Sequence, residues 1–170
     1  ERVTVWCGIS RNFIIGPYFF RENDRTVTVN TDRYLAMLRE FFLPELRRRR
    51  INLNTVWFQQ DGATCHTSRA TMEFLRQTFP GHLISLRGDV EWPPRSPDLS
   101  PCDYFLWGYL KERVYASKPR TLEALSEMIT LETRAVPREM LRRSMDNFSQ
   151  RLEECMEKNG RHLTDVIFRT

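Results

Sequence analysis

The stretch from Thr55 to His66, TVWFQQDGATCH, constrains the fold of this 170-residue chain more than any other. It opens with β-branched and aromatic residues, and such a run ending in polar residues and glycine predicts a buried strand. That strand would place the carboxylate of Asp61 at the edge of a sheet. Ligands of open α/β sheets bind beyond the carboxyl ends of strands, so Asp61 is a candidate for chemistry. An ordinary Asp-Gly turn explains the same dipeptide, and the stretch alone does not decide between the two interpretations.

Strand-like and helix-like segments alternate through the rest of the chain. Residues 2–10 and 13–20 predict an antiparallel hairpin, whose second strand is interrupted at Gly16-Pro17 because proline cannot donate to a ladder. Residues 82–86 predict another strand. Helical periodicity marks residues 31–50, with a break at Pro44, residues 67–79 and residues 104–116.

A change of character follows residue 118. Residues 119–170 carry two amphipathic helical patterns without a strand between them. The order of elements therefore predicts an α/β fold: a mixed sheet flanked by helices over residues 1–118, followed by a C-terminal helical extension over residues 119–170.

Composition narrows the class of protein. No apolar run approaches the ~20 residues that a membrane helix needs, and no signal-peptide pattern opens the chain, so we expect no membrane partner. The net charge of +4 is carried mainly by arginine, which permits nucleic-acid binding without requiring it. The cysteines are scattered and predict reduced thiols in an intracellular protein.

Four consecutive arginines, Arg47–Arg50, end the first helical pattern. Two interpretations remain open. The run fits a solvated last turn, where positive charge opposes the helix dipole favourably. It also fits a patch that contacts phosphates.

A second carboxylate follows a proline-rich loop, EWPPRSPDLSPCD. This loop is extended, and Ser100 with Pro101 predicts the start of the helix that continues through residue 116. Asp103 then lies in the first turn, where the dipole favours negative charge. Carboxylates that arrive on different elements, such as Asp61 and Asp103, suit a Mg²⁺ site for phosphoryl transfer. Asp98 is a rival for the second position.

The sequence motifs around Asp61 and Asp103 resemble those of a known family. QQDGATCHTS and WPPRSPDLSPCDYFLWGYLK strongly resemble the catalytic domain of mariner-like DDE/D transposases, which has an RNase H-like fold. The D-x-A-x-x-H motif of that family is matched by Asp61, Ala63 and His66. The third acidic residue of the family follows a W-P-P-x-S-P-D-L-x-P motif, and by this resemblance it maps to Asp103 in preference to Asp98. The resemblance spans roughly residues 3 to 116, and more weakly the helical extension.

The resemblance implies a function. Such transposases cut DNA at the ends of a mobile element and join the freed 3′-hydroxyl to target DNA, and three carboxylates hold two Mg²⁺ or Mn²⁺ ions. Asp61 and Asp103 would be the second and third of these ligands, with a longer spacing than is usual in the family. The partners implied are transposon ends, target DNA and a second copy of the chain, and the location implied is the nucleus. The candidate nucleic-acid contacts near the site are His66, Arg95, Lys111 and Arg113.

One departure from the family concerns the first carboxylate. The family carries it on a first strand upstream of the hairpin, and no acidic residue between positions 3 and 20 replaces it. Asp24 and Asp32 follow the hairpin and do not fit. We therefore expect an N-terminally truncated catalytic domain whose first strand is missing, inactive and marginally stable as this fragment. The alternative is a non-catalytic DNA-binding relic or co-opted module.

Overall fold

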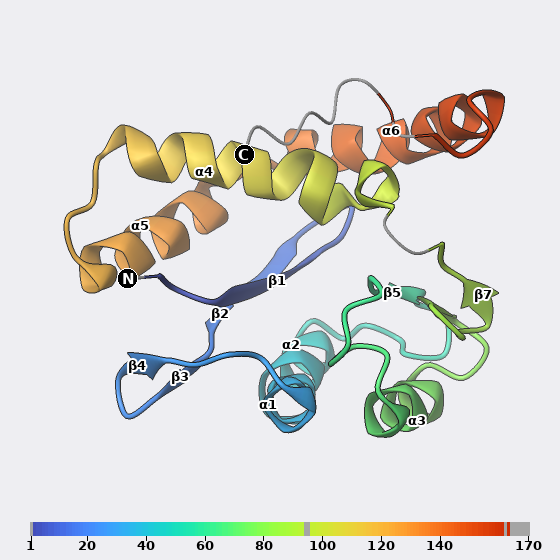
Figure 1. The fold of residues 1–170 in the computed structure, drawn as a ribbon, viewed down its shortest axis with the longest axis horizontal. Coiled ribbons are helices and arrows are strands. Elements are labelled where there is room, and N and C mark those ends of the chain that lie inside the picture. Colours follow the sequence, from blue (N-terminus) through green and yellow to red (C-terminus); the bar gives the residue numbers. More distant parts are fainter. Residues whose placement is uncertain (1, 94–95, 162, 164–170) are drawn as a thin grey trace. The chain divides into compact units, whose positions relative to one another are not determined.

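The computed structural model describes residues 2–93, 96–161 and 163. They form two compact units (Figure 1). The first unit comprises Glu1–Phe19 and Pro97–Thr170, and the second comprises Phe20–Ser96. Each unit is described by itself below.

The first unit begins with the predicted hairpin. Strands β1 (Val5–Ile9) and β2 (Ile14–Phe19) are antiparallel, with Trp6 opposite Tyr18 and Gly8 opposite Ile15. The residues between these pairs are one on β1 and two, Gly16-Pro17, on β2, so the ladder contains a bulge. The predicted interruption at this proline is confirmed.

Helices complete the first unit. Ser100 accepts hydrogen bonds from the Asp103 and Tyr104 N–H groups through its carbonyl, at the predicted helix start. The helical segments are η2 (Pro97–Leu99), η3 (Cys102–Leu106), α4 (Trp107–Ala116), α5 (Leu122–Ala135) and α6 (Arg138–Glu157). A core cluster joins the hairpin to η3, to α4, to the residue after α5 and to α6 through Cys7, Leu106, Leu110, Val136 and Leu141.

Helices α5 and α6 confirm the predicted helical extension. In Figure 1, α4 and α5 lie beside the hairpin, and α5 contacts β2. The predicted domain boundary after residue 118 falls inside the first unit, between α4 and α5. Independent folding is a separate property from compactness, so this boundary stays a prediction.

The second unit opens with a small hairpin and a long helical segment. Strands β3 (Arg21–Glu22) and β4 (Arg25–Thr26) pair antiparallel. Asn30 caps the helix, its Oδ1 accepting from the Arg33 N–H at 2.9 Å. Helix α1 (Thr31–Met37) continues through a π-helical stretch, η1 (Leu38–Phe42), into α2 (Leu43–Arg48). The π-helical stretch ends beside Pro44, which lacks the N–H that a regular α-helical turn uses.

A parallel sheet of short strands carries the stretch on which the fold prediction rests. Strand β5 (Phe58–Gln59) pairs with β6 (Leu83–Ser85), which pairs with β7 (Val90–Glu91). The prediction of a buried strand from Thr55 is wrong. The N–H groups of Thr55 and Val56 bond to the carbonyl of Asn52 in a turn, and Trp57 is 50% exposed. The prediction also missed β7, where the polar approach to Val90 favours a loop.

Helix α3 (Arg69–Thr78) packs in the second unit, and Ser68 caps it by accepting from the Thr71 N–H. Leu75 of this helix and Leu83 of β6 are fully buried. The rings of Phe58 and Phe79 stack with centroids 5.1 Å apart, and Phe42 lies 5.3 Å from Phe58. Both units thus combine strands with helices, and the predicted α/β class is confirmed.

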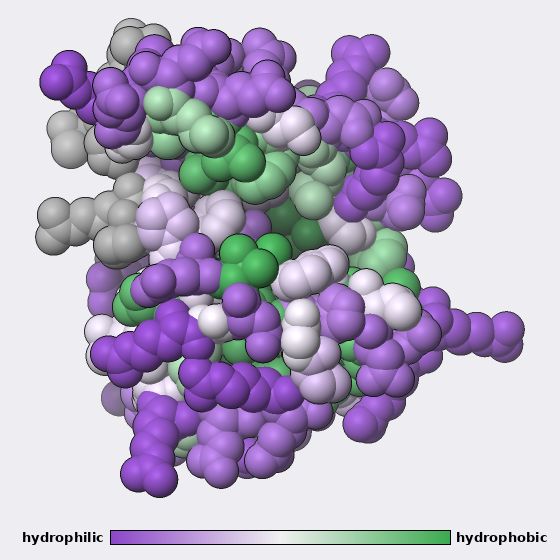
Figure 2. Space-filling view, turned by 90° about the vertical axis from the view of Figure 1, so that its right-hand side faces the viewer, coloured by the Kyte–Doolittle hydropathy of each residue, from purple (hydrophilic) through white to green (hydrophobic). Residues whose placement is uncertain are grey.

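The face of the molecule seen in Figure 2 is largely polar. Hydrophilic residues cover most of the face in Figure 2, in keeping with a mean hydropathy of −0.52. Among the described residues, no helix is both long and apolar enough to span a bilayer.

Candidate functional site

Asp61 lies two residues after the end of β5, directly after Gln60, at the start of a tight turn. Its Oδ1 accepts a hydrogen bond from the Ala63 N–H at 3.0 Å, so the carboxylate closes an Asx turn over Gly62. Its side chain is 57% exposed. The turn interpretation of this aspartate is therefore right as local geometry, and it leaves the carboxylate accessible to a ligand.

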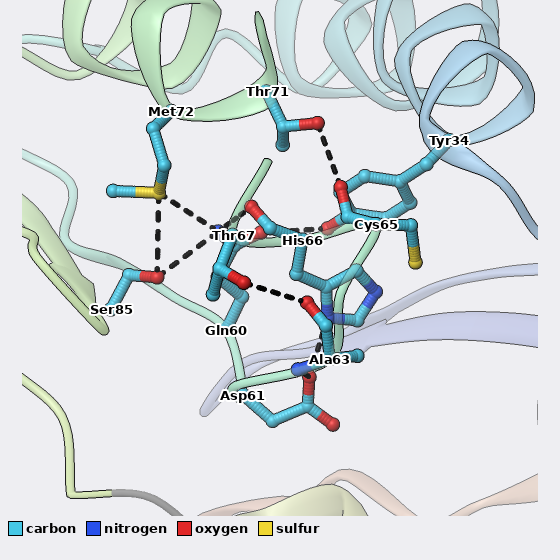
Figure 3. A network of polar contacts seen from close by, with 10 residues as sticks. All are labelled: Tyr34, Gln60, Asp61, Ala63, Cys65, His66, Thr67, Thr71, Met72 and Ser85. Atoms are coloured by element: carbon cyan, nitrogen blue, oxygen red, sulfur yellow. Dashed lines mark hydrogen bonds and ion pairs between the residues drawn. The ribbon is translucent and has the colours of Figure 1, made fainter. Parts of the chain in front are cut away.

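His66 returns to the same carboxylate. Its Nδ1 lies 2.5 Å from Asp61 Oδ1, and Figure 3 shows the second carboxylate oxygen pointing away from the ring. The imidazole packs on the Tyr34 ring of α1, with centroids 4.2 Å apart, and is only 18% exposed. The structure thus brings two of the sequence-predicted site residues together.

The contact changes the protonation of both groups. Burial lowers the pKa of His66, but hydrogen bonds and charge from Asp61 and Cys65 outweigh it and raise that pKa to about 9. The hydrogen bond from His66 holds the pKa of Asp61 below its ordinary value, against the smaller opposing effect of burial. At neutral pH the pair is an imidazolium beside a carboxylate.

Gln60 bonds this turn from the interior of the second unit, and the sequence analysis did not identify it as a site residue. Its side chain is 6% exposed and bonds to Tyr34, Ser85 and the His66 carbonyl. A signal was available, since an amide at the end of an apolar strand has to find partners inside the protein. Which partners it would find depends on α1 and β6, which the stretch itself does not contain.

Asp103 lies in the first unit, in the first turn of η3, and is partly buried. The neighbouring Tyr104 donates its hydroxyl proton to the Ser144 carbonyl at 2.6 Å, and its ring lies 4.4 Å from the guanidinium of Arg151. The rival Asp98 is 3% exposed, and its carbonyl accepts from Arg151 Nε at 2.5 Å. Asp103 is the more accessible of the two acids.

The basic candidates differ in their surroundings. Lys111 is exposed on α4. Arg113, on the same helix, donates from Nε to Glu132 at 3.0 Å, so its charge is partly neutralised. Arg95 lies outside the described residues.

The arginine run lies at the end of α2. Arg48 and Arg49 form ion pairs with Glu45, one turn back, with N–O distances of 2.7 and 3.8 Å. Arg47 and Arg50 are exposed. These internal pairs favour the solvated helix end over a phosphate patch for the two middle arginines.

The donor chemistry of Asp61 fits one position of a divalent-cation site. Exposed carboxylate oxygens are the ligands that Mg²⁺ and Mn²⁺ prefer, and the outward oxygen of Asp61 is such a donor. Across the residues that the structure describes, no three acidic, histidine or cysteine side chains gather as a metal site would require. Asp61 therefore fits as a single ligand and not as part of a completed protein cage.

The chain matches the fold of the Mos1 mariner transposase catalytic domain, which is RNase H-like. The structure of the Mos1 catalytic domain with raltegravir and Mn superimposes with a TM-score of 0.73 and 21% identity, covering 95% of this chain and 77% of that chain. The Mos1 mariner paired-end complex with Mn gives a TM-score of 0.75 and 22% identity, over 91% of this chain and 43% of that chain. At these identities the likeness concerns the fold.

A sequence relative then makes the assignment more specific. The chain is 34% identical over 105 residues to the transposable element Tc3 transposase of Caenorhabditis elegans. The match covers 61% of this chain and 30% of that protein, so the chain spans less than a third of this relative. No family model matches the chain. The fold and the relative confirm the resemblance to mariner-like transposases.

Proposed function

We propose that this chain is part of a transposase catalytic domain that acts on DNA. The observation that carries the proposal is the turn from Asp61 to His66, which presents a carboxylate at the end of a parallel strand in a chain with the Mos1 fold. A related Mos1 structure is a paired-end complex with the left transposon end, which supports transposon-end DNA as the partner class here. Target DNA, a second copy of the chain and a location in the nucleus belong to the same proposal.

In this proposal Asp61 and Asp103 are divalent-metal ligands. Mos1 catalytic domains have been solved with Mn and with Mg, which supports the choice of ion. A bound cation would supply Lewis-acid chemistry at a phosphodiester. Asp61 would contribute its outward oxygen, while His66 would hold the other oxygen and fix the orientation of the carboxylate.

Metal binding at Asp61 is the first test. We expect Mn²⁺ to broaden the NMR signals of the His66 ring strongly, because the ion would bind next to the carboxylate that His66 contacts. His82 serves as the reference within the same unit, because its ring nitrogen bonds to the Pro80 carbonyl and lies outside the Asp61 turn. Asp61→Ala should remove the selective broadening. Equal broadening of both rings, or broadening that survives in Asp61→Ala, would exclude Asp61 as a ligand.

A second candidate function is DNA binding without catalysis, which the net charge of +4, carried mainly by arginine, permits. Both candidates predict that residues 1–170 bind duplex DNA, more weakly as salt rises. We expect residues 1–170 not to nick supercoiled plasmid with Mn²⁺. The resemblance implies a metal site of three carboxylates, the first of which has no counterpart among residues 3–20, and removing one ligand of such a site removes most of the catalysis.

Lys111→Ala should weaken DNA binding more than Arg113→Ala, because Arg113 is already paired with Glu132.

Gel shifts and a plasmid-nicking assay separate the outcomes. Absence of a shift at low salt would contradict DNA as the partner for both candidates. Cleavage that Asp61→Ala abolishes would show that residues 1–170 are an active enzyme, against the expected inactivity. Binding without cleavage, combined with Mn²⁺ bound at Asp61, is the result expected for a catalytic domain that is incomplete in these residues.

A further inference from the structure

Gln60 lies immediately before the proposed ligand and uses its whole side-chain amide inside the protein. Its Oε1 accepts from the Tyr34 hydroxyl at 3.0 Å, and its Nε2 donates to the His66 carbonyl at 2.8 Å and to Ser85 Oγ at 3.1 Å. The amide orientation is unambiguous, because a carbonyl oxygen can only accept and must face the NH₂ group. A buried amide with both donors and its acceptor satisfied holds one geometry.

This network joins four parts of the second unit at one point. Tyr34 comes from α1 and Ser85 from the end of β6, while the backbone N–H of Gln60 extends the parallel ladder to the Ile84 carbonyl at 3.1 Å. The Met72 sulfur of α3 lies 3.6 Å from Nε2. Figure 3 shows Gln60 at the centre of these groups. Contacts with α1, α3 and β6 thus fix the orientation of the Gln60 amide, and the same amide bonds the His66 carbonyl of the turn.

Three backbone carbonyls of the turn accept hydrogen bonds from side chains. Gln60 Nε2 donates to the His66 carbonyl, Thr71 Oγ1 donates to the Cys65 carbonyl at 2.7 Å, and Thr67 Oγ1 donates to the Ala63 carbonyl at 3.1 Å. Tyr34 contributes twice, since its hydroxyl bonds Gln60 and its ring packs on the His66 imidazole. The backbone of His66 and its ring are therefore both tied to the Gln60–Tyr34 pair.

We propose that Gln60 is a positioning residue for the Asp61 site: with Tyr34 it holds His66 against one oxygen of Asp61 and leaves the other oxygen open to a divalent cation. The inference rests on the proposed role of Asp61 as a metal ligand. The amide also stabilises the fold, because an apolar side chain beside Met72 would remove one hydrogen-bond partner from the Tyr34 hydroxyl, from Ser85 Oγ and from the His66 carbonyl. The hydrogen bonds of the amide are directional, and the bond to the His66 carbonyl fixes the orientation of the turn.

Substitutions at Gln60 and Tyr34 test this role through Mn²⁺ affinity, measured by broadening of the His66 ring signals. Gln60→Met keeps the length of the side chain and removes its hydrogen bonds. We expect it to weaken Mn²⁺ binding about tenfold or more, the usual effect of losing a residue that orients a ligand. Tyr34→Phe removes one hydroxyl and keeps the ring against His66, so we expect a smaller loss, and it remains informative if Gln60→Met does not fold.

Leu75→Val is the matched control. Leu75 is fully buried in α3 of the same unit and takes part in none of the hydrogen bonds described above, and losing one methylene destabilises the unit by about 1 kcal/mol. It should keep the wild-type Mn²⁺ affinity. If Gln60→Met and Tyr34→Phe also keep it while Asp61→Ala loses it, the positioning role is wrong and the metal ligand stands. If Asp61→Ala binds like the wild type, the proposed function fails and the positioning role fails with it.

Discussion

Replacing Asp61 with asparagine is expected to lower the pKa of His66 from its value of about 9 in the metal-free protein. Burial lowers this pKa, the hydrogen bond with Asp61 is the largest of the interactions that raise it, and asparagine removes the charge of the carboxylate. Asparagine keeps an oxygen for the Ala63 N–H, so the Asx turn persists. NMR titration of the ring protons measures the change, with His82 as the internal reference.

The same substitution predicts a pH-dependent loss of stability. Because the folded pKa of His66 is raised, its contribution is complete below 6.5 and disappears as pH rises through about 9. Because the folded pKa of Asp61 is lowered, its contribution is present above 3.8 and disappears as pH falls through the folded value. The pair therefore stabilises the fold most between pH 3.8 and 6.5.

Urea unfolding of the wild type and Asp61→Asn at several pH values checks this. Solvent screens the half-exposed carboxylate, so we expect a difference of about 1–2 kcal/mol near the optimum, shrinking toward zero above the folded pKa of His66. A difference that stays constant with pH, or a His66 pKa that does not move in the variant, would show that the two side chains do not interact in solution.

Replacing Arg151 with methionine is expected to destabilise the first unit by about 2–4 kcal/mol. The guanidinium is 5% exposed; it donates to the Asp98 carbonyl and lies over the Tyr104 ring. Methionine keeps much of the packing of the stem and loses both polar contacts, which leaves a buried carbonyl without this donor. Because these contacts connect α6 to the segment that begins at Asp98, hydrogen exchange should rise at the amides of 102–106.

Arg142→Met is the control on the same helix, since Arg142 is exposed. It should change the free energy of unfolding by less than about 0.5 kcal/mol. Equal stability of the Arg151 and Arg142 variants would mean that the interactions of Arg151 contribute nothing net. The expected result would instead make α6 a working part of the scaffold around Asp103, although the sequence suggested an appended helical extension.

Sequence reasoning succeeded where local chemistry decides. The helical periodicity over residues 31–50 and 67–79 agrees with α1, α2 and α3, whose beginnings depend on nearby side chains: Asn30 and Ser68 bond free N–H groups of the first turn. The interruption of β2 at Pro17 follows from the missing donor. The order of strand-like and helix-like segments predicted the α/β class, and the motifs at residues 59–66 and 92–103 predicted the RNase H-like fold through a resemblance that spans most of the chain.

It failed where pairing or burial involves distant segments. The apolar run at Thr55 to Phe58 reads as a strand, but a turn at Asn52 takes its first N–H groups and leaves Trp57 half exposed. β7 is too short and too polar to be visible without β6 beside it. Arg151 reads as a surface charge on an amphipathic helix, and its burial depends on the carbonyl of Asp98 far earlier in the chain.

Asp61 shows the division most clearly. The sequence alone determined that an acid ends a strand, that a glycine follows it, and that a histidine comes five positions later in a word shared with mariner-like transposases. Only the tertiary structure decided that this histidine turns back onto the acid and that Gln60 and Tyr34 hold it there. The physical reason is that a buried amide and a buried ring take their geometry from whatever surrounds them, and the surroundings here come from α1, α3 and β6.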